Sequence, residues 1–272
     1  MCSHYQALKE QQRAARFRQQ FAIEPPAGTG KLDLWPGYLG TFIRSHPHAD
    51  VGDDSVPKAE ALNGLFGLVP HWATDLKITK STYNARSETV SEKPSFRDAW
   101  KRGQFCIIPA DAIYEPDWRS GKAISTRIES VNGEPLGIAG LWSSWKSPKG
   151  ELVHSYTMLT INADGHELMK QFHKPTDEKR MVVILPKPQY ADWLRVGPAD
   201  AQETQHQQLG ITTQGHQRDQ FSLVHINRER TLAGNRAADC LAPLVDHQDF
   251  TGQRRVSPGQ SGEFKTGHGC AG

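Results

Sequence analysis

Cysteine is scarce in this chain of 272 residues, with four at positions 2, 106, 240 and 270, and no two of them form a CxxC pair. The missing pair argues against a zinc ribbon or a thioredoxin-type redox site. So few cysteines in a chain of this length do not make a disulfide scaffold, and we expect a reducing, cytoplasmic compartment. We expect neither a metal nor another cofactor.

Long apolar runs are also missing. No run of 18 apolar residues occurs, and the N-terminus lacks the apolar segment of a signal peptide, so we predict neither a membrane span nor an export signal. The formal net charge is only +2. A local basic excess in the first 20 residues hints at an anionic partner, although a solvated basic helix is the more common explanation.

Tryptophan and tyrosine are absent from the C-terminal segment, because all seven Trp and all six Tyr lie at or before position 193. Residues 196–272 are instead rich in Gln, Gly, Thr, His and Asp. We predict that 196–272 is a polar, disordered tail, in which the strand-like segment 221–226 has little to pack against. The folded unit is then 1–195, one domain by size.

Within 1–195 the predicted elements are mainly strands. Apolar or alternating segments predict strands at 32–44, 61–72, 104–115 (interrupted by Pro109), 122–131, 136–145, 153–162 and 181–186. Helices are predicted at 5–21, 92–103, 163–172 and 188–195. Many strands with few helices indicate an α+β fold with a mainly antiparallel, barrel-like β core and flanking helices.

The chain begins Met1-Cys2. After removal of Met1, Cys2 would carry a free α-amine and a thiol on adjacent carbons. An α-amine has a pKa of about 8, so a useful fraction is nucleophilic at neutral pH. Such an amine attacks an aldehyde to give a Schiff base, and the thiol then closes a thiazolidine ring. Position alone favours an ordinary second residue, because structural cysteines are usually inert.

Three further stretches place polar residues where packing gives no reason for them: Asn84-Ala85-Arg86-Ser87-Glu88, Glu115 at the end of an apolar strand, and His173. Each has an ordinary explanation too. Asn84 suits a turn, Arg86 a surface, Glu115 the point where a strand meets water, and His173 a helix C-terminus. Metal ligation by His, Cys and Glu is conceivable, but these residues show no paired spacing that would support it.

Together these motifs resemble one family. The pattern comprises Met1-Cys2, GLVPHWATD at 67–75, NARSET at 84–89, CIIPADAIYE at 106–115, MLTINA at 158–163 and FHKPTDEKRMVVIL at 172–185. In order and spacing it resembles the SOS response-associated peptidase (SRAP) family of abasic-site processing proteins. The resemblance covers about residues 1–195 and is specific, because chance rarely reproduces so many motifs in order.

The resemblance implies a covalent reaction with damaged DNA. Members bind single-stranded DNA at an abasic site and crosslink to its aldehyde through the N-terminal cysteine, here Cys2, which shields the lesion during the DNA damage response. Asn84 would hydrogen-bond at the Cys2 amine, Glu115 would act as general acid and base, and His173 would assist at the sugar hydroxyl. Lyase activity by β-elimination and a thiol autopeptidase activity that removes Met1 are also implied.

The same resemblance implies a DNA-binding surface. Arg86 would contact phosphate, Trp72 would stack on a base beside the lesion, and Pro36 and Thr160 would line the cleft. Without the family pattern, a plain core residue is the preferred interpretation of Trp72. We expect a monomer whose partner is single-stranded DNA with abasic sites, associated with a bacterial nucleoid during repair; protein partners are not specified.

The chain departs from the family pattern in four places. Ser3-His4 replace Gly-Arg, which removes a cationic contact, and the Trp expected directly after Glu115 stands at 118. The segment from His173 to Arg180 is longer than usual, which could move His173 relative to Cys2. No resemblance is found after residue 195.

Two other functions remain open. An N-terminal-nucleophile amidohydrolase also uses a terminal cysteine, with thiolate attack on an amide and an oxyanion hole. It leaves the NARSET and IPADAIYE motifs unexplained. A DNA-binding module without covalent chemistry is the third interpretation.

Overall fold

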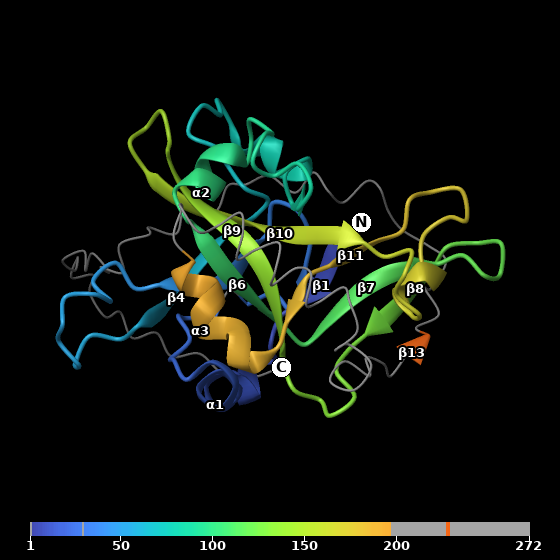
Figure 1. Ribbon diagram of the computed structural model, residues 1–272, viewed down its shortest axis with the longest axis horizontal. Helices are drawn as coiled ribbons and strands as arrows, with labels where there is room; N and C mark the ends of the chain where they lie inside the picture. The colour runs from blue at the N-terminus through green and yellow to red at the C-terminus, as the bar shows by residue number, and fades with distance from the viewer. Residues whose placement is uncertain (1, 29, 197–226, 229–272) are drawn as a thin grey trace, which may run out of the picture. The chain divides into compact units, whose positions relative to one another are not determined.

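The computed structural model describes residues 2–28, 30–196 and 227–228 (Figure 1). The chain divides into two compact units, Met1–Thr231 and Leu232–Gly272, and every described residue belongs to the first. The predicted disorder of 196–272 and the strand-like segment 221–226 therefore lie outside the described residues, except at Val196 and at 227–228.

Strands outnumber helices, as predicted. The strands are β1 His4–Gln6, β2 Asp33–Leu34, β3 Leu39–Ser45, β4 Ala59–Phe66, β5 Asn84–Arg86, β6 Phe105–Ala110, β7 Ala112–Asp117, β8 Ile124–Ile128, β9 Leu136–Lys146, β10 Leu152–Asn162, β11 Arg180–Val182, β12 Ile184–Leu185 and β13 Asn227–Arg228. The helices are α1 Glu10–Phe21, α2 Arg97–Lys101 and α3 Tyr190–Arg195, with short 3-10 helices at Leu76–Lys80, Met169–Gln171 and Lys187–Gln189.

Five strands close a barrel. Their order is β10, β4, β3, β6 and β9, and β9 pairs back onto β10 to complete the ring (Figure 1). Four of these pairings are antiparallel, and only β10 with β4 is parallel. The interior is filled by side chains such as Phe42, Phe66 and Tyr156, which are fully buried and whose rings contact one another. The predicted α+β fold with a mainly antiparallel, barrel-like core is confirmed.

The N-terminal strand β1 is an inner strand of a second sheet, between β7 and β2, with the order β13, β8, β7, β1, β2 and antiparallel pairing throughout. The prediction of a helix from residue 5 is therefore wrong for its first turn. Tyr5 is fully buried in β1, and α1 begins only at Glu10. Pairing with β2 and β7 overrides the helical preference of the local sequence.

Two further predictions of secondary structure need correction. Pro109 does not interrupt its strand: it pairs with Gly137 inside β6, and the break falls at Asp111, which forms an ion pair with Arg16. Residues 163–172 contain only the 3-10 helix Met169–Gln171. There the His166 ring accepts hydrogen bonds from two backbone N–H groups of the following turn, which favours a turn over a longer helix.

The helices lie outside the barrel. In α1, Phe17 is buried, and Phe21 stacks on Tyr190 of α3 with ring centroids 5.4 Å apart. Within the described ranges, no helix is both long and apolar enough to cross a membrane.

Candidate active site

Cys2 is buried two residues before β1 begins at His4, with 1% of its surface exposed. Its Sγ lies 3.4 Å from the carbonyl oxygen of His4. Since His4 pairs with Tyr114 of β7, this N-terminal strand brings Cys2 beside Glu115, the next residue of β7. Burial raises the pKa of the Cys2 thiol, and the nearby charge of Glu115 raises it further. The thiol is therefore protonated in the resting protein.

Asn84 approaches Cys2 from the barrel side. It begins β5, which is held parallel to β10 by the pairing of Asn84 with Met158. Its Nδ2 donates a hydrogen bond to the carbonyl oxygen of Cys2 at 2.7 Å. Its Oδ1 is buried and accepts no hydrogen bond from the described residues. The amide thus fixes the Cys2 backbone and leaves an acceptor for a donor such as an amine.

Glu115 is the most deeply buried carboxyl group of this centre, at 1% exposed. Neither of its oxygens accepts a hydrogen bond of good geometry from the described part of the chain. Burial raises the pKa of Glu115 from 4.5 to about 7, and interaction with the Cys2 thiol opposes that rise in part. A carboxyl group with a pKa near neutrality can both donate and accept a proton.

His173 completes the centre from a loop after β10. Its Nε2 lies 3.1 Å from the carbonyl oxygen of Arg180 and 3.4 Å from Oε2 of Glu115. A carbonyl only accepts, so Nε2 bears the proton in that hydrogen bond. Burial lowers the pKa of His173, which keeps the ring neutral at pH 7. In the neutral ring the protonated Nε2 is a donor only, so His173 can donate toward Glu115 but does not take a proton from it at that nitrogen.

The backbone around His173 explains why the longer loop does not move it away. His173 has a φ of 63°, unusual for a residue other than glycine, and its N–H donates to the carbonyl of Pro116 at 2.9 Å. At the far end of the loop, Lys179 Nζ donates to the carbonyls of Phe172, His173 and Lys174 at 2.9, 3.2 and 2.7 Å. Both ends of the loop are thus fixed beside β7.

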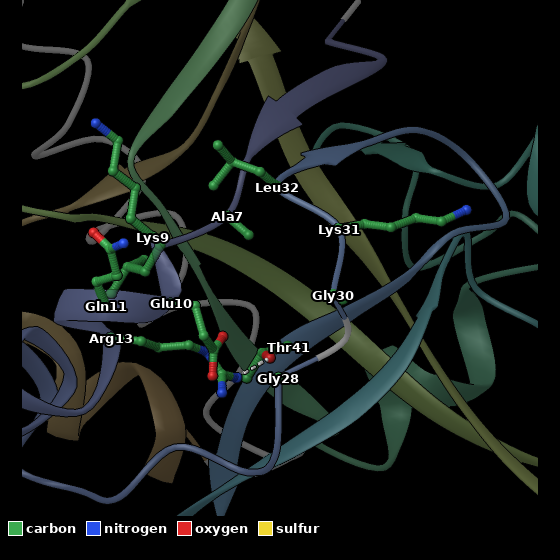
Figure 2. Close-up of a pocket in the computed structure, with 12 residues that line it drawn as sticks. Ala7, Lys9, Glu10, Gln11, Arg13, Gly28, Gly30, Lys31, Leu32 and Thr41 are labelled. Atoms are coloured by element: carbon green, nitrogen blue, oxygen red, sulfur yellow. Dashed lines mark hydrogen bonds between the residues drawn. The ribbon is translucent and has the colours of Figure 1, made fainter.

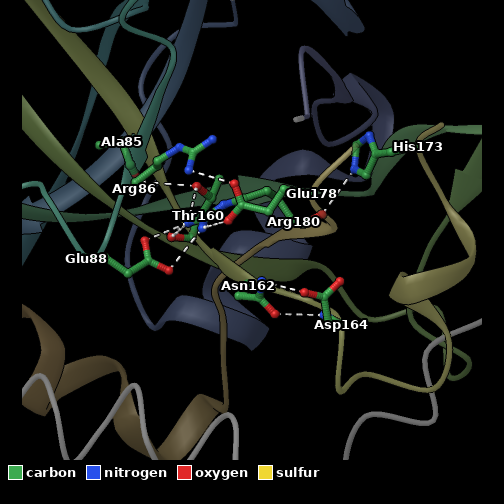
Figure 3. A network of polar contacts seen from close by, with 9 residues as sticks. All are labelled: Ala85, Arg86, Glu88, Thr160, Asn162, Asp164, His173, Glu178 and Arg180. Atoms are coloured by element: carbon green, nitrogen blue, oxygen red, sulfur yellow. Dashed lines mark hydrogen bonds and ion pairs between the residues drawn. The ribbon is translucent and has the colours of Figure 1, made fainter. Parts of the chain in front are cut away.

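A second polar group lies at the edge of this centre and is shown in Figure 3. We call it the arginine cluster, composed of Arg86, Glu88, Glu178 and Arg180. Arg180 is 3% exposed. Its two Nη atoms reach the Glu88 carboxylate at 3.0 and 2.8 Å and Oε1 of Glu178 at 2.8 Å. Oε2 of Glu178 in turn accepts from Arg86 Nη1 at 2.7 Å.

The sequence assigns a role to Arg86; Glu88 lies in the same stretch of polar residues but receives no role, and Glu178 and Arg180 are not predicted as parts of a site. The sequence does contain a signal, because the motifs at 84–89 and 172–185 each place charged residues directly beside strand residues. What the sequence does not give is the pairing that joins them: β5 and β11 both flank β10, so that Arg86 and Val182 lie on either side of Thr160.

The remaining predicted DNA-binding residues lie in different surroundings. Thr160 is 1% exposed, and its backbone oxygen accepts a hydrogen bond from Arg180 at 2.8 Å. Trp72 is 47% exposed, so it is not a plain core residue; its Nε1 donates to the carbonyl of Pro94 at 3.3 Å. Pro36 is half-buried, two residues after β2.

The structure also shows what replaces the residues missing from the family pattern. The His4 ring stacks between Trp35 and Tyr114, with ring centroids 4.2 and 4.1 Å away. Its Nε2 lies 3.0 Å from the Asp33 carboxylate. Trp118 has Lys174 Nζ 5.1 Å above its ring, a cation–π contact between β7's end and the His173 loop.

A cavity of about 570 Å³ lies away from this centre, beside α1 (Figure 2). Lys9, Glu10, Arg13 and Lys31 line it, and none of the predicted site residues does. Arg13 is held there by Thr41 Oγ1 at 2.8 Å. Among the described residues, no group of three His, Cys, Asp or Glu side chains is arranged to hold a metal ion.

Curated relatives of this chain are named abasic site processing proteins. YoqW of Bacillus subtilis is 39% identical over 130 residues, which cover 47% of this chain and 54% of the relative. HMCES of Rattus norvegicus is 26% identical over 210 residues, which cover 65% and 55%. The chain therefore spans about half the length of the curated relatives it matches.

Solved structures show the same fold. A crystal structure of a protein from Bordetella bronchiseptica is 43% identical, with a TM-score of 0.69, over 84% of this chain and 100% of that chain. A protein from Bacteroides thetaiotaomicron, 21% identical with a TM-score of 0.57 over 74% and 85%, is similar in fold alone. The family model described as SOS response associated peptidase (SRAP) matches residues 1–229, past the 195 at which sequence reasoning ends the resemblance. Because that match covers most of its length, this chain belongs to the SRAP family.

Proposed function

We propose that this protein processes abasic sites in single-stranded DNA by forming a covalent crosslink through Cys2. The observation that carries the proposal is the convergence of Cys2, Asn84, Glu115 and His173, which come from four separate segments of the chain. Asn84 contacts Cys2 at 2.7 Å and His173 approaches Glu115 at 3.4 Å. The relatives' names, which refer to abasic sites, support the same activity.

The reaction begins once Met1 is removed and the α-amine of Cys2 is free. The opened abasic sugar presents an aldehyde, and the amine adds to its carbon and expels water to give an imine. The Cys2 sulfur then bonds to the imine carbon, and the thiol proton passes to nitrogen, which closes a thiazolidine. Because burial keeps the thiol protonated, the second step needs a nearby base.

Glu115 is placed to serve both steps. With a pKa of about 7, it can give a proton to the departing water and accept one from the thiol. His173, neutral and 3.4 Å from Glu115, would act at the sugar hydroxyl and relay protons. The Asn84 Oδ1, which accepts no hydrogen bond among the described residues, would accept one from the Cys2 amine. That contact orients the nitrogen lone pair toward the aldehyde.

DNA binding would use the edge of the same centre. Arg86 would contact a phosphate, and the exposed Trp72 ring would stack on a base. Pro36 would border the cleft, while the buried Thr160 would support it from beneath. An imine at an abasic sugar also permits β-elimination, so we include strand-incising lyase activity in the proposal. Thiol-dependent removal of Met1 belongs to it as well.

The test mixes the purified protein, its N-terminus verified by mass spectrometry, with an oligonucleotide that carries one abasic site. We expect a heat-stable adduct on a denaturing gel. Cys2→Ala keeps an α-amine but has no sulfur, so its adduct should appear only after borohydride reduction of the imine. Cys2→Ser is the matched control and should behave like Cys2→Ala.

Three results would overturn the proposal. A heat-stable adduct that persists in Cys2→Ala would exclude the thiazolidine. Amide hydrolysis without an adduct would favour an N-terminal-nucleophile amidohydrolase, and DNA binding without an adduct would favour a non-covalent module.

A further inference from the structure

Glu178 occupies a position between two arginines in the arginine cluster. Its Oε1 contacts Arg180 Nη1 at 2.8 Å, and its Oε2 contacts Arg86 Nη1 at 2.7 Å. Figure 3 shows the carboxylate between the two guanidinium groups, which come from β5 and β11. Two guanidinium groups directed at one anionic group form a site suited to an oxyanion.

The charges of the cluster cancel in the resting protein, because two arginines face two glutamates. The two halves differ in exposure, however. The Arg180 side chain is 3% exposed and is held by Glu88 and Thr160. The Arg86 and Glu178 side chains are 47% and 40% exposed. Glu178 can therefore leave by rotation of its own side chain, while Arg180 keeps Glu88 as its partner.

This site is joined to the Cys2 centre by the backbone. Arg86 lies two residues after Asn84 in β5, and the carbonyl of Arg180 accepts the hydrogen bond from the His173 ring at 3.1 Å. An anion held by Arg86 would thus lie along the same strand that contacts Cys2. In the resting protein the anion beside Arg86 is the carboxylate of Glu178, which belongs to the loop between His173 and Arg180.

We propose that Glu178 makes the protein select a DNA strand over an isolated anion, because its carboxylate competes with a DNA phosphate for Arg86. This inference rests on the proposed function. A phosphodiester bears one negative charge, as the carboxylate does, and it must displace Glu178 to reach Arg86. An isolated anion gains little binding free energy when it replaces the Glu178 carboxylate at Arg86. A strand that also makes other contacts is favoured, because those contacts hold its phosphate at the site.

The test measures binding of full-length protein to a single-stranded oligonucleotide without an abasic site, by fluorescence anisotropy over a range of salt. We expect Glu178→Gln to bind about three- to tenfold more tightly than wild type at low salt, because an exposed ion pair no longer has to be broken. Its affinity should also fall more steeply with salt, since no carboxylate takes up a cation when DNA binds.

Glu151→Gln is the matched control, because it removes the same charge from an exposed position in the turn between β9 and β10. It should bind within about twofold of wild type. In Glu178→Gln combined with Arg86→Gln, the gain should disappear, as a double-mutant cycle requires if the two side chains act on each other.

The outcomes separate this inference from the proposed function. If wild type forms the heat-stable adduct but Glu178→Gln binds no more tightly than Glu151→Gln, the inference about Glu178 is overturned and the proposed function stands. If the gain survives loss of Arg86, the effect is one of net charge, and the inference is overturned as well. If wild type neither binds nor crosslinks single-stranded DNA, both are overturned.

Discussion

The Cys2 centre and the arginine cluster are neighbours built on opposite principles. In the centre, Glu115 is buried with no hydrogen bond to either oxygen among the described residues, and burial moves its pKa to about 7. In the cluster, Arg180 is buried just as deeply, yet it contacts two carboxylates and a carbonyl oxygen. The Cys2 centre thus offers few contacts that would stabilise a charge on Glu115, whereas the arginine cluster stabilises the charge of Arg180 with several.

The difference separates proton chemistry from charge binding. A buried carboxyl group without well-formed hydrogen bonds costs folding free energy, but it titrates near pH 7 and is available for proton transfer. A buried guanidinium with two carboxylates stays charged at every relevant pH. It can position other groups, but it cannot exchange protons. We therefore expect variants of the two regions to fail in different ways.

The largest effect is expected from Glu115→Gln, which removes the exchangeable proton and keeps the shape. The rate of adduct formation should fall by about 10²- to 10⁴-fold, while affinity for intact single-stranded DNA stays at the wild-type value. Single-turnover gel assays and anisotropy measure the two quantities. A variant that crosslinks at the wild-type rate would remove Glu115 from the mechanism.

Next in size is Arg180→Ala, which should act on stability. Loss of a buried cation with charged partners should lower the free energy of unfolding by about 3 kcal/mol, at the lower end of such effects because Glu88 and Glu178 remain accessible to water. Urea unfolding followed by fluorescence gives the value. Arg18→Ala, which breaks the exposed ion pair with Glu24, is the control and should cost less than about 1 kcal/mol. Equal losses in both would contradict the structural role of Arg180.

The smallest effect concerns the pH dependence of stability. The folded pKa of Glu115 is raised from 4.5 to about 7, so its contribution to stability is present below 4.5 and is lost as pH rises through 7. Because glutamine does not ionise, the Glu115→Gln variant does not lose this stability as pH rises. Between about pH 5 and pH 8 its free energy of unfolding should gain about 2 kcal/mol relative to wild type. Parallel pH profiles for the two proteins would show that Glu115 is not buried as described.

Much of the fold follows from the sequence, because alternation and apolar runs report directly on strand burial. The failures come from contacts between distant segments. Residues 5–9 have helical preferences, but β1 is fixed by pairing with β2 and β7. Pro109 signals a break by itself, yet it stays within β6, where it pairs with Gly137. The local sequence does not reveal that β1 pairs with β2 and β7, or that Gly137 lies opposite Pro109.

The candidate site shows the same limit. Cys2, Asn84, Glu115 and His173 each stand out as polar where packing gives no reason for it, but each also has an ordinary explanation. The resemblance to the SRAP family is what joins them into one predicted site. The pairing of Glu178 with Arg86 was not recognisable. It depends on the parallel alignment of β5 with β10 and on the fold of the loop after His173. Composition and spacing contain no information on either.

The loop between His173 and Arg180 offers a position for attaching a probe. Its two ends are held by hydrogen bonds from His173 to Pro116 and Arg180, and by Lys179 across the base. Thr176 at the tip is exposed, and its hydroxyl makes a long hydrogen bond of 3.4 Å to the carboxylate of its neighbour, Asp177. A cysteine introduced there by Thr176→Cys, labelled with a fluorophore, would report the arrival of DNA from a few residues away while leaving the reacting groups in place.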